Sequence, residues 1–168
     1  LNLFAYTGGA TLAAAAAGAT VTHVDASKGM VTWAKENAVS SGLKDAPIRW
    51  LVDDCVKFVE REIRRGNTYD AIIMDPPSYG RGPKGEIWKI EDMIHPLIRL
   101  CAKILSKDAL FFLVNSYTTG LAPAVLTYMI STELKSWNGH VDSQEIGLPV
   151  TNSGLVLPCG ASGRWESR

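Results

Sequence analysis

The sequence has few cysteines, and none of them is paired. Its three cysteines, Cys55, Cys101 and Cys159, lie far apart and lack the spacing of a zinc site or of a disulfide framework. The three histidines are equally scattered, so no metal is expected. An odd number of unpaired cysteines fits a reducing, cytoplasmic setting.

The sequence also lacks an excess of charge and a long apolar run. Its 17 basic and 17 acidic residues cancel, so this chain alone has no strong electrostatic attraction for nucleic acid. The apolar run Leu12–Ala17 is far short of the roughly 20 residues that span a bilayer. With 46% hydrophobic residues, we expect one globular domain over residues 1–168. The chain starts at Leu1, inside an apolar run, so we expect the natural protein to extend further N-terminally.

Strand-like and helix-like segments alternate along the whole chain, which predicts an α/β fold with a doubly wound sheet. Gly18 is expected to cap the first helix and Ser27 to begin the second. His23 is expected to be a core or edge residue of the second strand. The last two strands also allow a hairpin with long loops. Strands are expected near 1–5, 20–25, 47–52, 70–75, 109–115, 140–147 and 153–160, and helices near 9–18, 27–41, 54–65, 88–106 and 121–137.

The segment 70–80 holds the most informative motif. An apolar strand leads into Asp75-Pro76-Pro77-Ser78, and two prolines cannot continue a strand ladder. Ligands collect at the carboxyl ends of parallel strands, so Asp75 and nearby carbonyls can face a flat substrate there. A simple strand stop is the alternative. The following segment, 78–87, has three glycines and a proline and is predicted to be a mobile loop over the site. Arg81, Lys84 and Lys89 would lie beside that site.

Two further strand ends carry a glycine turn and an acid. Thr7-Gly8-Gly9 opens a helix, where backbone amides can approach a ligand closely. The Gly-x-Gly-x-x-Gly fingerprint of dinucleotide sites is absent there, which argues against pyrophosphate binding. Asp25 ends the second strand and can accept hydrogen bonds from both ribose hydroxyls. Together these features indicate a nucleoside-binding crevice.

The third strand ends in two acids, Asp53 and Asp54. One of them can accept a hydrogen bond from an adenine amino group, and the other can cap the next helix. Asp54 is favoured for adenine, but the sequence leaves the choice open. With Asp75, four consecutive strand ends carry a turn or a carboxylate on one rim of the sheet, which is much more specific than any one of them.

These motifs resemble the class I S-adenosylmethionine-dependent methyltransferases. The segments 1–11 and 75–79 look like the branch of large-subunit ribosomal RNA cytosine-C5 methyltransferases. The resemblance covers the whole chain. It implies a seven-stranded Rossmann-like sheet, mostly parallel with an antiparallel last strand, S-adenosylmethionine as cofactor, and ribosomal RNA as partner. Members of this branch usually carry an N-terminal RNA-binding domain.

The resemblance also implies roles for individual residues. Tyr6, Thr7, Gly8 and Gly9 would surround the methionine part of the cofactor. Asp25 would hold the ribose and Asp54 the adenine, while Asp75 and Pro76 would flank the methyl group and the target. The expected cofactor site comprises Phe4, Tyr6, Thr7, Gly8, Gly9, Asp25, Ala26, Asp53, Asp54, Cys55 and Asp75, and the expected catalytic residues are Asp75, Pro76, Pro77 and Tyr79.

The chain departs from the cytosine-C5 pattern. Methylation at C5 needs a cysteine thiolate that adds to C6. Here Ser78 and the segment 115–118, Asn-Ser-Tyr-Thr, occupy the two places where that cysteine is found. An exocyclic amine or ring nitrogen needs less help, because its lone pair attacks once it is aligned. A nitrogen target is therefore favoured. Tyr79 is predicted either to stack on a splayed base or to pack the loop, and Tyr117 either to line the target pocket or to fill space.

Three other functions stay open at this point. The chain can methylate a small molecule or a protein side chain on the same scaffold, which its neutral charge favours mildly. It can be a cofactor-binding module without catalysis, in which case it would bind the cofactor without turnover. A nicotinamide oxidoreductase comes last because of the glycine pattern. The sequence does not define the oligomeric state, and a homo-oligomer stays open.

Overall fold

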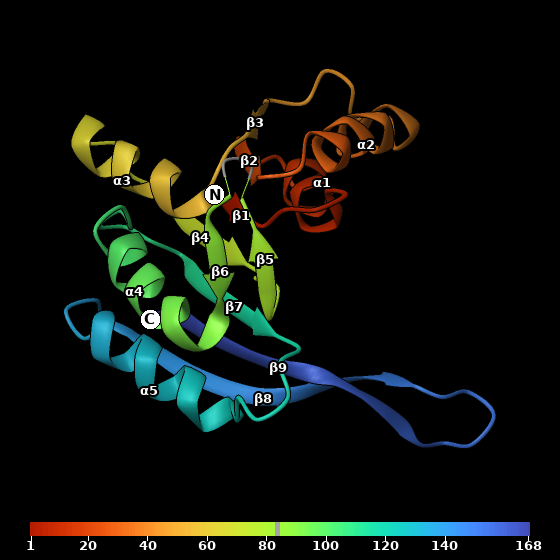
Figure 1. Ribbon diagram of the computed structural model, residues 1–168, viewed down its shortest axis with the longest axis vertical. Coiled ribbons are helices and arrows are strands. Elements are labelled where there is room, and N and C mark those ends of the chain that lie inside the picture. Colours follow the sequence, from red (N-terminus) through yellow and green to blue (C-terminus); the bar gives the residue numbers. More distant parts are fainter. Residues whose placement is uncertain (83–84) are drawn as a thin grey trace.

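The computed structural model describes residues 1–82 and 85–168, and it contains a seven-stranded sheet (Figure 1). The strands of this sheet are β1 (Asn2–Leu3), β2 (Val21–Asp25), β3 (Ile48–Val52), β4 (Ala71–Met74), β7 (Phe111–Ser116), β8 (Gly139–Pro149) and β9 (Val156–Ser167). A separate hairpin contains β5 (Tyr79–Arg81) and β6 (Ile87–Lys89). The helices are α1 (Gly9–Ala16), α2 (Lys28–Ser40), α3 (Cys55–Arg65), α4 (Ile90–Ala102) and α5 (Pro123–Glu133).

The strand order is β3-β2-β1-β4-β7-β9-β8. The pairs β1–β2, β2–β3, β1–β4 and β4–β7 are parallel, whereas β9 runs antiparallel to both β7 and β8. The predicted α/β fold, with a mostly parallel sheet and an antiparallel last strand, is therefore confirmed. The strand order reverses between β1 and β4, which is where open α/β sheets form their ligand crevice.

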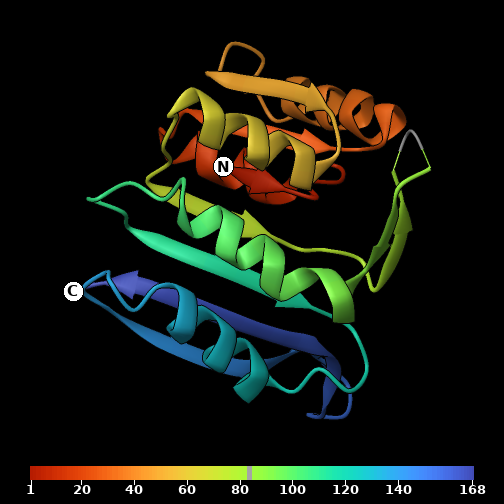
Figure 2. The same ribbon diagram turned by 60° about the vertical axis from the view of Figure 1, so that its left-hand side comes forward.

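Helices cover both faces of the sheet. Figure 2 shows α3, α4 and α5 side by side on one face, with α1 and α2 on the other face beside β1, β2 and β3. In α4 the buried residues Ile90, Ile94, Leu97, Ile98 and Cys101 follow a helical period, so one side of the helix faces the core. Within the described residues, no helix is long and apolar enough to cross a membrane.

The two predicted helix boundaries are confirmed. The Ser27 hydroxyl caps α2 by accepting a hydrogen bond from the Met30 amide at 3.4 Å. At the end of α1, Gly18 adopts a left-handed φ of 91° while its amide donates to the Ala15 carbonyl at 3.0 Å. Most other predicted elements lie within a few residues of their observed bounds.

Two segments differ from their predicted structure. The segment 78–87 is not a loop, because Tyr79–Arg81 and Ile87–Lys89 pair as an antiparallel hairpin. The glycines of this segment favoured a loop, but Gly80 lies within strand β5. Lys84 lies outside the described residues. Near the C-terminus, β8 and β9 form the hairpin that the sequence left as an alternative, with long strands and a short connection.

A polar trio lies buried beneath the first turn. The Asn2 amide donates to the Thr11 hydroxyl oxygen at 2.9 Å, and this oxygen lies 2.9 Å from His23 Nδ1. All three residues are buried, so of the two expected places for His23, core or edge, it occupies the core. Among the described residues, His23 Nε2 has no partner. Burial of the imidazole lowers the pKa of His23 to about 4.

We expect His23 to make the protein acid-sensitive. The unfolded chain takes up a proton near pH 6.5, but the folded chain does so only near the lowered pKa of about 4. Stability contributed by the neutral imidazole is thus present above pH 6.5 and is lost between there and pH 4. The free energy of unfolding should drop by about 2 kcal/mol between pH 7 and pH 5 from this group. Urea unfolding of the wild type and of His23→Asn at both pH values measures the difference, and equal pH slopes would contradict it.

Candidate active site

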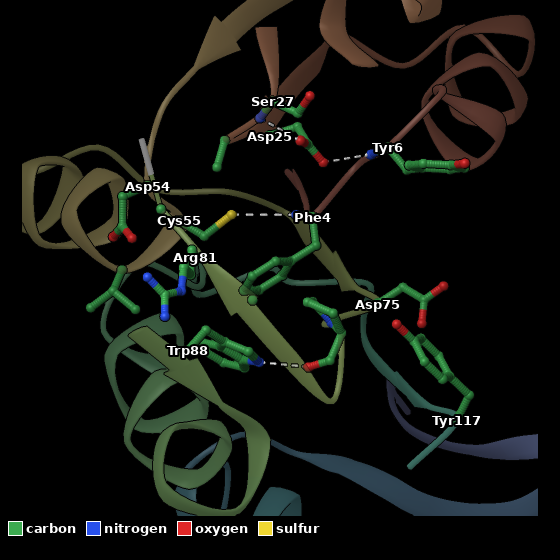
Figure 3. Close-up of a pocket in the computed structure, with 15 residues that line it drawn as sticks. Phe4, Tyr6, Asp25, Ser27, Asp54, Cys55, Asp75, Arg81, Trp88 and Tyr117 are labelled. Atoms are coloured by element: carbon green, nitrogen blue, oxygen red, sulfur yellow. Dashed lines mark hydrogen bonds between the residues drawn. The ribbon is translucent and has the colours of Figure 1, made fainter. Parts of the chain in front are cut away.

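A cavity of about 550 Å³ opens at the carboxyl ends of the parallel strands (Figure 3). Residues that follow β1, β2, β3, β4 and β7 line it, together with residues of the β5–β6 hairpin. The cavity therefore lies at the rim where the sequence places its four motifs. Its lining consists of Phe4, Tyr6, Asp25, Ala26, Ser27, Asp54, Cys55, Val56, Asp75, Pro77, Gly80, Arg81, Gly82, Trp88 and Tyr117.

The turn after β1 is strained and is held from several sides. Phe4 and Tyr6 have φ values of 53° and 48°, a left-handed conformation that costs non-glycine residues about 1–2 kcal/mol each. The Phe4 amide donates to Cys55 Sγ at 3.3 Å, and the Ala5 amide donates to the Val24 carbonyl at 3.1 Å. Strain of this kind persists where the surrounding structure fixes it, and it often marks a ligand site.

Asp25 is held by two backbone amides. Its Oδ2 accepts from the Tyr6 amide at 2.9 Å, and its Oδ1 accepts from the Ser27 amide at 2.8 Å. Figure 3 shows this carboxylate between the turns that follow β1 and β2. Each carboxylate oxygen can accept about two hydrogen bonds, so both oxygens keep capacity for a ligand. The two backbone amides therefore fix the orientation of the Asp25 carboxylate on the cavity lining.

The two acids after β3 have different surroundings. Asp54 lines the cavity, and its Oδ1 also caps α3 by accepting from the Lys57 amide at 2.9 Å. Asp53 is not among the lining residues and forms an ion pair with Arg61. From the sequence we expect one of the two acids to bind adenine and the other to cap α3. In the structure Asp54 both faces the cavity and caps α3.

Cys55 supports the site rather than reacting in it. The residue is buried, its sulfur accepts the Phe4 amide, and burial raises the pKa of its thiol far above the usual range. Cys101 is also buried, and its pKa is raised for the same reason. Thiolates are the reactive form of cysteine, so neither residue is poised as a nucleophile.

Asp75 differs from the other two carboxylates of the cavity. It has no hydrogen-bond or ion-pair partner in the part of the chain that the structure describes. The Asp75 side chain is exposed, and the partial desolvation of its carboxyl group raises its pKa above the ordinary value. Figure 3 shows its side chain beside the ring of Tyr117. A carboxylate with free acceptor capacity thus faces the end of the cavity that is bounded by Pro77 and Tyr117.

The β5–β6 hairpin forms one wall of the cavity. Trp88 Nε1 donates to the Pro77 carbonyl at 2.6 Å, and the Trp88 ring packs on the Phe4 ring with centroids 4.9 Å apart. Lys57 of α3 forms an ion pair with Glu86, next to β6. These contacts connect the hairpin to the proline turn, to the first turn and to α3, so the hairpin belongs to the site.

A comparison with protein families identifies the chain. The family model of S-adenosylmethionine-dependent methyltransferases matches residues 1–138. The chain belongs to this family. S-adenosylmethionine is accordingly its methyl donor, and three carboxylates, those of Asp25, Asp54 and Asp75, lie on the cavity lining. No group of three or more metal-ligating side chains occurs within the described residues.

Known relatives of this methyltransferase include ribosomal RNA enzymes. Ribosomal RNA large subunit methyltransferase K/L of Shewanella frigidimarina is 36% identical over 106 residues, which is 60% of this chain and 15% of the relative. Methyltransferase K of Neisseria meningitidis serogroup B is 32% identical over 118 residues, or 69% of this chain and 33% of the relative. The chain thus spans only about a seventh to a third of these curated relatives.

Solved structures also resemble the methyltransferase. A methyltransferase from Agrobacterium tumefaciens superposes with a TM-score of 0.96 at 43% identity, covering 99% of this chain and 55% of that one. A protein described as a methyltransferase complexed with SAH gives a TM-score of 0.79 at 26% identity, covering 98% and 44%.

The predicted site residues are only partly brought together in this methyltransferase. Of the predicted set, Phe4, Tyr6, Asp25, Ala26, Asp54, Cys55, Asp75 and Pro77 line the cavity, whereas Thr7, Gly8, Gly9, Asp53, Pro76 and Tyr79 do not. Gly8 serves packing: a Cβ there would lie 3.1 Å from the Ala34 Cβ of α2, and its φ is 90°. Pro76 is buried, while Tyr79 is 52% exposed.

Several lining residues were not in the predicted set, namely Ser27, Val56, Gly80, Arg81, Gly82, Trp88 and Tyr117. Ser27 and Val56 directly follow predicted positions, so a wider window around each strand end would have included them. The sequence predicts that Arg81 is a basic residue beside the site, and it allows Tyr117 to line the target pocket. Both residues line the cavity. Trp88 both packs on Phe4 and lines the cavity.

Proposed function

We propose that this methyltransferase modifies a nitrogen of a base in large-subunit ribosomal RNA. The observation that carries the nitrogen assignment is Asp75, a carboxylate on the cavity lining without a protein partner among the described residues. The RNA assignment is supported by the names of the relatives, which are ribosomal RNA methyltransferases. Exposed Tyr79 and Tyr117, at 52% and 56%, add aromatic surface near the proline turn on which an unstacked base can lie.

The residues of this chain have separable tasks. S-adenosylmethionine, when bound, would supply the methyl group. Asp25 would hold it through its ribose and Asp54 through its adenine. Asp75 would accept an N–H of the target amine, which orients the nitrogen lone pair for attack, and would then receive the displaced proton or pass it to water.

Cytosine C5 is the less favoured acceptor. Cys55 is the only cysteine on the described cavity lining, and it is buried with a raised pKa. The positions at which related C5 enzymes have a cysteine hold Ser78 and Tyr117 instead. The Ser78 hydroxyl lies 2.7 Å from the Thr118 hydroxyl, so these polar groups satisfy each other. No described residue therefore supplies the thiolate that C5 chemistry requires.

Replacing cysteines should leave turnover nearly intact. We expect Cys55→Ser, which keeps an acceptor for the Phe4 amide, and Cys159→Ser to retain methyl transfer within about fivefold. A lost nucleophile would instead cost several orders of magnitude. Wild-type protein should also form no covalent adduct with RNA that contains 5-fluorocytidine, as checked by denaturing electrophoresis. An adduct that disappears in one of these variants would restore the cytosine-C5 assignment.

The acceptor class is tested by competition. Protein supplied with tritiated S-adenosylmethionine is offered unmodified large-subunit ribosomal RNA transcript, total soluble protein, and a small-metabolite extract. We expect label in the RNase-sensitive fraction alone. Label in protein or in small molecules would support the neutral-charge alternative. Cofactor binding without transfer to any of the three would support a non-catalytic module.

A further inference from the structure

The β5–β6 hairpin has two different faces. Residues directly opposite each other in a hairpin point to the same side, and side chains alternate along each strand. The outer face therefore comprises two directly opposed pairs, Tyr79 with Lys89 and Arg81 with Ile87. The inner face holds Trp88, which is 8% exposed, packs on the Phe4 ring and donates to the Pro77 carbonyl. Because Trp88 fixes the inner face to the body of the protein, the outer face is turned to solvent.

The outer face is exposed and lies next to the cavity. Tyr79 and Ile87 are 52% and 57% exposed, and Arg81 and Lys89 are exposed as well. Figure 2 shows the hairpin beyond the carboxyl ends of the parallel strands, where the cavity opens. Arg81 also belongs to the cavity lining, so the outer face adjoins the cavity. A polymer that delivers a target base into the cavity is therefore within reach of this face.

The outer face carries positive charge that the protein itself does not neutralise. Within the described residues, Arg81 and Lys89 form no ion pair. The one acid in the sequence 79–89 is Glu86, which forms an ion pair with Lys57 of α3. Cations beside an exposed aromatic ring are the combination that binds single-stranded nucleic acid, because phosphates pair with the cations and a base stacks on the ring.

We propose that the outer face of the β5–β6 hairpin binds single-stranded RNA next to the target base. The inference rests on the proposed RNA substrate. Arg81 and Lys89 contact phosphates, and the Tyr79 ring stacks on a neighbouring base. An acidic peptide offers the charge but no base to stack, and a duplex keeps its bases stacked within the helix. Glu91 and Asp92 follow in the first turn of α4 and weaken the positive field, so the contact is weak and depends on salt.

Salt-dependent RNA binding tests the contact. A fluorescein-labelled single-stranded RNA of about 12 nucleotides is titrated with protein, and fluorescence anisotropy gives the affinity at salt concentrations from about 25 to 150 mM. Each phosphate contact on a single strand contributes about 0.7 to the slope of log affinity against log salt, so Lys89→Gln should lower this slope by about 0.7. Tyr79→Ala should weaken binding at least about fivefold at an unchanged slope, because it removes stacking and no charge.

Lys103→Gln is the matched control. Lys103 follows the last residue of α4, about 20 Å along the helix axis from Lys89, and its side chain is also exposed. This variant should keep the wild-type affinity and slope. Neither Tyr79 nor Lys89 lines the cavity, so both hairpin variants should bind S-adenosylmethionine as the wild type does, which shows that they are folded.

The outcomes separate this contact from the proposed function. A wild type that does not bind the RNA at low salt, hairpin variants that keep the wild-type affinity and slope, or an equal loss in Lys103→Gln would overturn the contact. Methyl transfer to the ribosomal RNA transcript is measured on the same proteins. Transfer by variants with unchanged RNA binding would remove the hairpin and leave the proposed function. RNA binding that depends on the hairpin, without transfer by the wild type, would leave the contact and contradict the proposed function.

Discussion

Asp75→Asn should greatly slow methyl transfer while leaving the protein folded and able to bind its cofactor. We expect turnover to fall by on the order of 100-fold or more, which is typical for loss of a positioned acid–base group. The substitution keeps the shape of the side chain but removes the negative charge and half of its acceptor capacity. Single-turnover transfer from tritiated S-adenosylmethionine to the RNA transcript measures the effect.

The free energy of unfolding distinguishes a catalytic role of Asp75 from a structural one. In the folded protein the pKa of Asp75 is raised by partial desolvation, so the ionised carboxylate is less favourable there than in the unfolded chain. Its ionisation therefore costs stability as pH rises past the ordinary carboxyl pKa. At neutral pH the Asn variant should consequently be at least as stable as the wild type in urea. An inactive variant that is also clearly destabilised would point to a structural role, and an active one would remove Asp75 from the mechanism.

The same pKa shift predicts the acid limb of the activity profile. The reaction needs the ionised carboxylate, and the pKa of Asp75 lies above the ordinary Asp value. Turnover should therefore decline with falling pH at a higher pH than an ordinary aspartate would give. This limb should be missing from the residual activity of Asp75→Asn.

Asp25→Ala should cost the protein its cofactor. The variant leaves the Tyr6 and Ser27 amides without their acceptor. It also removes the carboxylate that we propose as the partner of the ribose. Hydrogen bonds to charged groups contribute about 1.5–3 kcal/mol each. Loss of the two hydrogen bonds from the ribose hydroxyls should therefore weaken cofactor binding by at least about 100-fold. Calorimetric titration with S-adenosylmethionine measures the loss. NADH, titrated in parallel, should not bind the wild type, because the dinucleotide fingerprint is absent.

The two acids after β3 provide matched controls. Asp53→Ala removes a carboxylate that pairs with Arg61 outside the cavity lining, so affinity should change less than about threefold. Asp54→Ser removes the carboxylate on the lining but keeps an oxygen that can cap α3. It should weaken binding by about tenfold at unchanged stability. If Asp53→Ala weakened binding more than Asp54→Ser, the assignment of the adenine contact would be reversed.

The strand ends were predictable because they follow from local patterns. The apolar runs that stop at Asp25, at Asp53 followed by Asp54, and at Asp75 indicate parallel strands. Parallel strands place their carboxyl ends on one rim of the sheet. The cap at Ser27 and the glycine at position 18 likewise depend on neighbours in sequence. Such features require no knowledge of the tertiary structure.

The remaining features depend on contacts between distant segments. The hairpin over the cavity is held by the contact of the Trp88 ring with the Phe4 ring and by the hydrogen bond from Trp88 to the Pro77 carbonyl. No local sequence pattern predicts these contacts. The glycines of the hairpin therefore suggested a loop. The left-handed turn at Phe4 and Tyr6 depends on Cys55 and Asp25, which lie far along the chain. Whether Asp53 or Asp54 faces the cavity was open because both follow the strand directly.

The most direct test of this account is the identity of the methylated nucleoside. The wild-type protein is incubated with methyl-labelled S-adenosylmethionine and unmodified large-subunit ribosomal RNA transcript, and the RNA is digested to nucleosides for mass spectrometry. The account predicts one nucleoside methylated on nitrogen, formed on the order of 100-fold more slowly by Asp75→Asn. Formation of 5-methylcytidine would contradict the role given to Asp75, and absence of any methylated nucleoside from a protein that binds the cofactor would contradict the proposed substrate.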